Sequence, residues 1–164
     1  MFDFDISAET SDSIMQNSSQ STQSDKSKFA HDRKYSTVSE TSPELNPFWI
    51  AKLKKLIIIK YLRISMYPDR AKNKLSDLSG LSISISTEAE HPTKWLTCFR
   101  LNGNPNVWEY DIKLGLFIPD CLGGQARHVK IQINDNKPRK LILGEVQIFG
   151  EIYIFIWSNQ MKKL

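Results

Sequence analysis

The sequence predicts an all-β fold, an antiparallel β-sandwich, and three observations support this prediction. Apolar and polar residues alternate over short segments, most cleanly in LSISIS at 81–86, and this period of two is typical of half-buried strands. Turn-forming residues separate one such segment from the next. No stretch longer than about ten residues carries a convincing helical period, and several short strands with regular turns are typical of a sandwich.

The sandwich is expected to run from residue 29 to residue 157, with residues 158–164 as a tail. Residues 1–28 are rich in Ser, Thr, Gln and Asp. Such a segment cannot bury enough apolar surface to offset its ordering entropy, so we expect most of it to be disordered. The predicted strands in chain order are FWIAKL (48–53), KLIIIKYLRISMY (55–67), LSISIST (81–87), KWLTCFRL (94–101), VWEYDIKLGLFI (107–118), HVKIQI (128–133), LILGEVQIFG (141–150) and EIYIFIW (151–157).

The segment ARHVKIQINDNKPRKLILGEVQIFG at 126–150 shows the pattern most fully. VKIQI and LILGEVQIF each alternate, and the turn-rich NDNKPR joins them, which predicts two half-buried strands with a short connection. The Lys and Arg side chains of that connection are expected to be solvated. Two strands do not fold alone, so the rest of the chain must supply a partner sheet.

Charge and hydropathy argue against nucleic-acid or membrane-spanning functions. The net charge is +4, and the basic residues are spread along the chain, with KLKK at 52–55 the densest group. A nucleic-acid-binding protein usually clusters such residues with aromatics on one element, so we predict no nucleic-acid partner. No apolar run reaches the roughly 18–20 residues of a membrane span. LIIIKYLRI at 56–64 is interrupted by Lys60 and Arg63 and is expected to form a buried strand with solvent-facing cations.

The sequence shows no pattern typical of catalysis. It has no GxSxG, HExxH, P-loop or GxGxxG motif. Its three histidines, His31, His91 and His128, lie in different contexts, and His128 alternates with apolar strand residues, so it is expected to pack or to face solvent. Paired carboxylates occur only in the predicted loops and tail. We therefore predict a binding module and no enzyme.

The spacing of the two cysteines does not decide whether they form a disulfide. Cys98 and Cys121 enclose 22 residues and have neither a CxxC pattern nor the spacing of zinc ligands. They are compatible with a disulfide or with two free thiols.

The C-terminal part of the sequence resembles the final strands of F-type lectins, the fucolectin and tachylectin-4 (pentraxin-1 type) family of the discoidin-like, F5/8 type C superfamily. Those proteins end in a segment like GRYVRIQ…LTLCEVEVYG, which corresponds here to ARHVKIQ at 126–132 and LILGEVQIFG at 141–150. NSSQSTQS at 17–24, FAHD at 29–32 and NPFWIAKL at 46–53 resemble earlier family motifs in the same order. The resemblance implies a discoidin-like jelly roll.

The family's sugar-binding signature is a His, 26 residues, Arg-x-Asp, four more residues, and then Arg or Lys. Aligning VSET at 38–41 with the family's C-S-H-T places Glu40 at the His position, and 26 residues separate Glu40 from Tyr67. Tyr67 and Asp69 then fill Arg-x-Asp, and Lys74 follows after four residues. The resemblance thus implies a ligand site of Glu40, Tyr67, Asp69 and Lys74. Because an acceptor and a phenol replace two cationic donors, it implies an altered, degenerate fucose pocket.

The cysteines also match a family pattern. Cys98 and Cys121 correspond to one family disulfide, so the resemblance implies that they are bridged. Val38 and Gly144 occupy the positions of the two cysteines of a second family disulfide, so this chain lacks both cysteines of that bridge.

The family carries a structural calcium, and two of its ligands have counterparts here. Asp32 and Glu145 match these ligands, which implies a Ca2+ site, while Lys34 stands where a further oxygen is expected. Calcium takes six to eight oxygen ligands, and an ammonium among them would repel it. Lys34 is therefore an alternative partner for Asp32 or Glu145 in place of the ion.

The resemblance implies a carbohydrate-binding module, with a glycan or glycoprotein partner and a secreted location, although the N-terminus lacks the basic and apolar regions of a signal peptide. Two alternatives remain open. One is a non-lectin interaction or structural module that has lost sugar binding. The other is a binder of anionic surfaces through the basic residues at 52–55 and 137–140. The four tryptophans are expected to be core or sheet-face aromatics rather than sugar platforms: Trp49, Trp95, Trp108 and Trp157.

Overall fold

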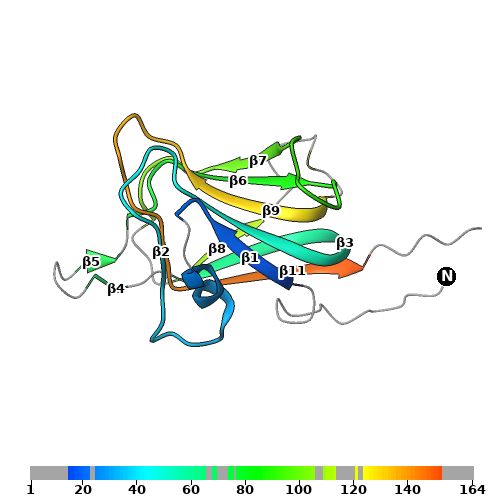
Figure 1. The fold of residues 1–164 in the computed structure, drawn as a ribbon, viewed down its shortest axis with the longest axis horizontal. Coiled ribbons are helices and arrows are strands. Elements are labelled where there is room, and N and C mark those ends of the chain that lie inside the picture. Colours follow the sequence, from blue (N-terminus) through cyan, green and yellow to red (C-terminus); the bar gives the residue numbers. More distant parts are fainter. Residues whose placement is uncertain are drawn as a thin grey trace, which may run out of the picture.

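The computed structural model describes residues 15–22, 25–65, 68–69, 74–75, 77–105, 109–113, 121 and 124–152, and at residues 25, 68, 69, 74, 75, 113 and 152 it describes the backbone alone. Nearly all of the regular structure in this part is β-strand (Figure 1). The elements are β1 (Met15–Gln20), the 3-10 helix η1 (Asp25–His31), β2 (Ser39–Glu40), β3 (Phe48–Ser65), β4 (Pro68–Asp69), β5 (Lys74–Leu75), β6 (Leu81–Ser86), β7 (Leu96–Arg100), β8 (Glu109–Lys113), β9 (Gln125–Ile133), β10 (Ile142–Leu143) and β11 (Glu145–Ile152).

Strand β3 links the two layers of the sandwich. Its first half pairs with β1 and β9, and β6 and β7 extend that layer beyond β9. Its second half pairs with β11 and with β8, which form the other layer. The pairing with β9 continues past the bend at Ile57 and Ile58. All these pairings are antiparallel. The predicted antiparallel β-sandwich is confirmed, but the two strands expected over 48–53 and 55–67 are a single continuous strand.

A bend in β3 marks the passage from one layer to the other. The register with β9 shifts between Lys52 and Ile57, and Lys54 and Lys55 are exposed there. The first residue of β1 and the last residue of β11 also lie at this bend, because Met15 is opposite Leu53 and Ile152 is opposite Ile57. Pairs of lysines are suited to this position, since their side chains reach solvent at the end of the sandwich.

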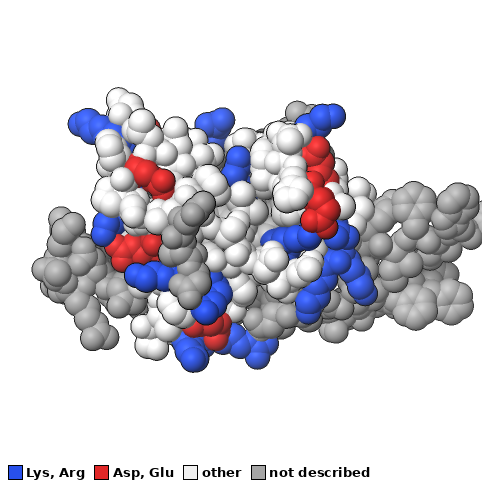
Figure 2. Space-filling view, in the orientation of Figure 1, with Lys and Arg blue, Asp and Glu red and all other residues white. Residues whose placement is uncertain are grey.

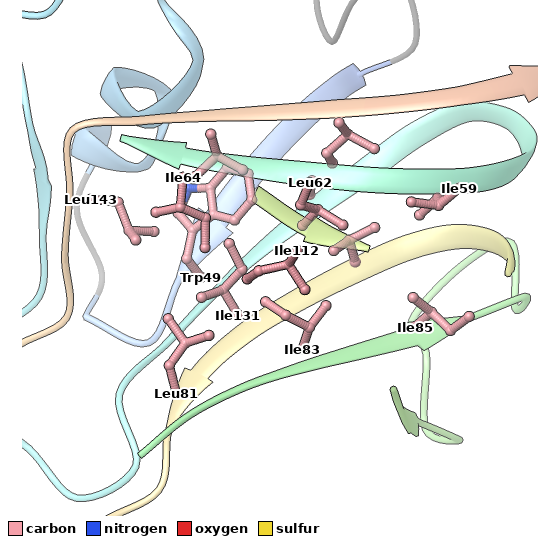
Figure 3. Packing of buried hydrophobic residues seen from close by; sticks show 14 of the residues in the cluster. Trp49, Ile59, Leu62, Ile64, Leu81, Ile83, Ile85, Ile112, Ile131 and Leu143 are labelled. Atoms are coloured by element: carbon pink, nitrogen blue, oxygen red, sulfur yellow. The ribbon is translucent and has the colours of Figure 1, made fainter. Parts of the chain in front are cut away.

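The core fills the space between the layers (Figure 3). Trp49, Ile83 and Ile131 from one layer face Leu62 and Ile64 from the other, and each is fully buried. Burial of one such side chain stabilises the fold by about 1.5–3 kcal/mol. The indole N–H of Trp49 donates a hydrogen bond to the carbonyl oxygen of Ser27 at 2.9 Å, so its polar atom is satisfied inside the core.

The first strand predicted within 126–150 forms as β9. The second, LILGEVQIF, divides at Gly144 into β10 and β11, and β9 and β11 do not pair with each other. β9 lies between β3 and β6, whereas β11 pairs with the second half of β3. Their connection contains β10, which pairs with β2. The prediction that the charges of this connection are solvated is wrong for Arg139. Its side chain is 18% exposed, and its guanidinium donates to the carbonyl oxygens of Ser79 at 2.6 Å and Asp77 at 2.9 Å.

Strand β6 has the predicted alternation, yet both of its faces are buried. Leu81, Ile83 and Ile85 point into the core, while Ser82, Ser84 and Ser86 on the opposite face are each 4% exposed. β6 lies between β7 and β9, whose longer side chains cover the small serines. The hydroxyls find partners there, as in the 3.0 Å hydrogen bond between Ser84 and Thr97.

The N-terminal segment departs from the expectation of disorder at Met15–Gln20, which forms β1. These residues pair with the edge of β3 from Trp49 to Leu53, and Met15 is 5% exposed. The backbone hydrogen bonds of an edge strand do not depend on side-chain hydrophobicity, which explains why composition did not predict them. η1 likewise begins inside the range that was expected to be disordered.

The disulfide implied by the family resemblance is confirmed: Cys98 in β7 is bridged to Cys121, with 5.7 Å between their Cα atoms. Trp49 is a core residue and Trp95 is half-buried on a sheet face, while Trp108 and Trp157 lie outside the described residues. Among the residues that the structure describes, no helix has the length and apolar character needed to cross a membrane.

Gly150 allows β11 to approach β3 closely, and replacing it should destabilise the fold. The register shifts between Phe149 and Gly150, and a Cβ atom at Gly150 would lie 2.4 Å from the carbonyl oxygen of Ile58. We expect Gly150→Ala to lower the free energy of unfolding by about 3 kcal/mol, the upper end for overpacking, as measured by urea denaturation.

Gly103 provides the matched control, because a Cβ atom there meets nothing within 4 Å and only its positive φ of 81° opposes substitution. Gly103→Ala should cost about 1 kcal/mol. Equal losses in the two variants would contradict the steric explanation for Gly150.

Candidate functional site

Three of the four residues of the predicted ligand site, Glu40, Asp69 and Lys74, belong to strands toward one end of the long axis of the molecule (Figure 1). Asp69 in β4 is directly opposite Lys74 in β5, and β2, which carries Glu40, lies toward the same end as this hairpin (Figure 1). The four-residue spacing in the sequence is therefore that of a hairpin loop. Tyr67 lies outside the described residues.

The backbone of Glu40 is held by a buried polar network. β2 pairs with β10, so that Glu40 is opposite Ile142. The side-chain amide of Gln20 donates to the carbonyl oxygen of Glu40 at 3.0 Å, and the Ser39 hydroxyl donates to Gln20 Oε1 at 2.7 Å. Gln20 and Ser39 are 8% and 2% exposed. Such a network orients the site backbone before any ligand arrives.

A second set of hydrogen bonds fixes the loop after β2. The Thr22 hydroxyl donates to Glu44 at 2.9 Å and accepts from the backbone N–H of Ser42 at 2.7 Å. Ser21 also donates to Glu44, and its oxygen accepts the N–H of Phe48 at 3.1 Å. The QST motif at 20–22, matched only by family resemblance, thus has a physical role in supporting the Glu40 segment.

Lys140 is the partner of Glu40, and sequence reasoning did not identify it. Its ammonium forms an ion pair with the Glu40 carboxylate, and the two side chains are 45% and 33% exposed. A cation therefore lies beside the position where the family has a His, although it comes from the strand connection and not from position 40. Only knowledge of the β2–β10 pairing would have pointed to Lys140, because it is 100 residues away in the sequence.

Asp32 and Glu145, which the resemblance matches to calcium ligands, are near enough for the charge of Asp32 to raise the pKa of Glu145. The Asp32 carboxylate accepts the backbone N–H of Lys34 at 2.9 Å and the hydroxyl of Thr37 at 2.8 Å. Arg33 has a φ of 61°, and its N–H donates to Glu145 Oε1 at 3.4 Å. The group of Lys34 that bonds to Asp32 is therefore the backbone N–H, and the ammonium makes no such bond among the described residues.

Glu145 is a buried carboxyl group. It is 2% exposed, and its Oε2 atom has no hydrogen-bond partner among the described residues. Burial raises its pKa to about 7, the N–H of Arg33 opposes that rise, and the nearby Asp32 carboxylate adds to it.

The described donors do not by themselves fit calcium. The unpartnered Glu145 oxygen next to Asp32 is the kind of group that a cation would satisfy, but calcium takes six to eight oxygens. No group of three or more His, Cys, Asp or Glu residues that could hold a metal occurs in the described part of the chain. Bound calcium stays a prediction of the family resemblance.

Glu145 should make stability depend on pH. Because its folded-state pKa of about 7 lies above the ordinary value of 4.5, the folded chain binds more protons between these values, and the free energy of unfolding falls as pH rises through this window. We expect the free energy of unfolding, measured by urea denaturation at pH 4.5, 6 and 8, to fall by about 1–3 kcal/mol over this range. Glu145→Gln should not show this fall. If the free energy of unfolding changes with pH to the same extent in both proteins, Glu145 is not the group responsible.

The calcium prediction is tested on the same two proteins at pH 8. A bound ion would raise the melting temperature of the unsubstituted chain in calcium chloride relative to EDTA, and Glu145→Gln would lose that difference. Equal melting temperatures in the two buffers would contradict calcium binding.

No protein-family model and no curated protein sequence matches the chain, but solved structures do. A mutant of the lectin domain of lectinolysin in complex with Lewis b is 20% identical, with a TM-score of 0.64 over 85% of this chain and 94% of that chain. A fucolectin from striped bass (Morone saxatilis) serum is 17% identical, with a TM-score of 0.64 over 84% of this chain and 46% of that chain. A fucose-binding module of Streptococcus pneumoniae is 18% identical, with a TM-score of 0.62 over 88% and 97%. The chain therefore has the discoidin-like β-sandwich fold of these lectins and carbohydrate-binding modules.

Proposed function

We propose that this chain is a carbohydrate-binding module whose ligand site occupies the F-type lectin position with different residue types. The observation that carries the proposal is the pairing of Asp69 with Lys74, at the spacing of the family's motif, within a fold shared with fucose-binding and Lewis b-binding domains. Glu40 with its partner Lys140 at the same end adds to that support.

The four charged residues suit a neutral, hydroxyl-rich ligand. Sugar hydroxyls would donate to the carboxylates of Glu40 and Asp69 and accept from the ammonium groups of Lys74 and Lys140. These are charge-assisted hydrogen bonds, which are about twice as strong as neutral ones. Two negative and two positive groups cancel, so the site has no net charge that would favour an ionic ligand.

The altered residue types should change which sugar is accepted. A polar site discriminates strongly against ligands that leave its buried groups unpaired. Glu40 needs a donor hydroxyl where the family's His position offers a ring nitrogen. We therefore propose a hydroxyl pattern different from that of L-fucose bound in the family's manner. A secreted location stays a prediction.

A glycan-array screen of the full chain, with and without calcium, tests this function. We expect selective binding to a small set of neutral glycans, reduced at least tenfold by Lys74→Ala and little changed between 50 and 300 mM NaCl. Lys60→Ala is the matched control, because Lys60 pairs with Glu151 on the sandwich body. A blank array from a chain with a normal circular-dichroism spectrum and melting curve would contradict the proposal and favour the interaction or structural module.

A further inference from the structure

The outer face of the larger layer carries an aromatic and basic cluster far from Glu40. Trp95, just before β7, extends across the small serines of β6 toward β9. The ammonium of Lys130 lies 4.4 Å from the centre of a Trp95 ring, and the His128 ring meets Trp95 edge-on with centroids 6.5 Å apart. Ser84 and Ser86 of β6, which are opposite Lys130 and His128, are buried.

The bend of β3 adds cations next to this cluster. Lys52 is directly opposite His128, and the exposed Lys54 and Lys55 follow it. Arg127 on β9 faces the unpaired part of the bend, and its Nε atom is buried with no partner among the described residues. Figure 2 shows Lys and Arg side chains gathered over this bend. We define the basic face as Lys52, Lys54, Lys55, Trp95, Arg127 and Lys130.

Two carboxylates lie near the basic face, those of Glu88 and Glu90, and each already has a partner. Glu90 pairs with Lys52 at 2.6 Å. The carboxylate of Glu88 instead accepts the backbone N–H groups of Thr93 and Lys94, at 2.5 and 2.8 Å. Two carboxylates therefore stand against five cations among the described residues here, and the face keeps an excess of positive charge. Like charges held together repel, and a bound polyanion would relieve that repulsion.

Titratable groups of this cluster are partly desolvated. Burial lowers the pKa of Lys130. Burial also lowers the pKa of His128, and the charges of Lys52 and Arg127 add to that effect. A partly desolvated ammonium gains more from an anion than one in bulk water, because water screens the interaction less.

We propose that the basic face binds an acidic polysaccharide, a sugar chain bearing carboxylate or sulfate groups. The lysines and Arg127 would pair with the anionic groups, and the partly exposed indole of Trp95 would lie against the C–H face of a sugar ring. One aromatic ring among spaced cations fits a sugar chain better than single-stranded nucleic acid, whose bases stack on successive aromatics. The basic face and the β2 and β4–β5 segments lie toward opposite ends of the molecule, so this site is independent of the proposed function (Figure 1).

The test is titration of the full chain with heparin and with polygalacturonate, using neutral dextran and a 20-base-pair duplex DNA as comparison ligands. We expect both acidic polysaccharides to bind, with an affinity that falls steeply with salt, and dextran not to bind. Lys54→Gln with Lys55→Gln should weaken heparin binding about tenfold and lower the slope of log Kd against log salt by about two, one per lost contact. Lys130→Gln should weaken it further.

The matched control is Lys28→Gln with Lys137→Gln, which makes the same change in net charge on exposed residues away from the bend. Equal weakening by the control pair would show that binding follows overall charge and would overturn the proposal. Duplex DNA binding as tight as heparin, with the same sensitivity to Lys54 and Lys55, would overturn it in favour of a nucleic-acid site. No binding of either polysaccharide at 50 mM NaCl would also overturn it. Each variant is first checked for an unchanged melting temperature.

Discussion

The fold depends on one strand that belongs to both layers. β3 pairs with four other strands: β1 along its first half, β11 and β8 along its second, and β9 on both sides of the bend. Its inward residues therefore contribute to both walls of the core, from Trp49 at one end to Ile64 at the other. A change of register along β3 would move every neighbouring strand, because a shift of one residue exchanges buried and exposed faces. Two irregularities of the sheet, the bulge opposite Gly150 and the bend at Lys54, both lie in this strand.

The sequence predicted where the strands lie better than it predicted which strands pair with each other. Alternation identified the segments that became β3, β6, β9 and β11, because a half-buried strand must present every second side chain to the core. Pairing was harder, since it depends on residues far apart along the chain. Nothing in LSISIS indicates that its serines are buried, and nothing in NDNKPRK indicates that Arg139 bonds to Ser79. β1 was missed because an edge strand can be held by its backbone alone.

The ligand site stays a prediction, but the structure explains one feature of its motif. Asp69 and Lys74, which the motif spacing separates by four residues, are opposite each other in a short hairpin. Glu40 was identified, but its partner Lys140 and its support from Gln20 were not, because these contacts join segments that only the folded chain brings together. The cluster around Trp95 was missed for the same reason. Its members come from β3, β9 and the segment before β7, and no local pattern marks them as a group.

The position of Met15 in β1 and of Ile152 in β11, both next to the β3 bend, has a mechanical consequence. A force applied between these two residues would act on the sandwich at the bend. β1 and β11 would then separate from β3 one hydrogen bond after another, starting at the loaded end, instead of sliding along their whole length at once. Resistance to such a force would be low at the bend, whereas the segments around Glu40 would carry no load until both strands had come away.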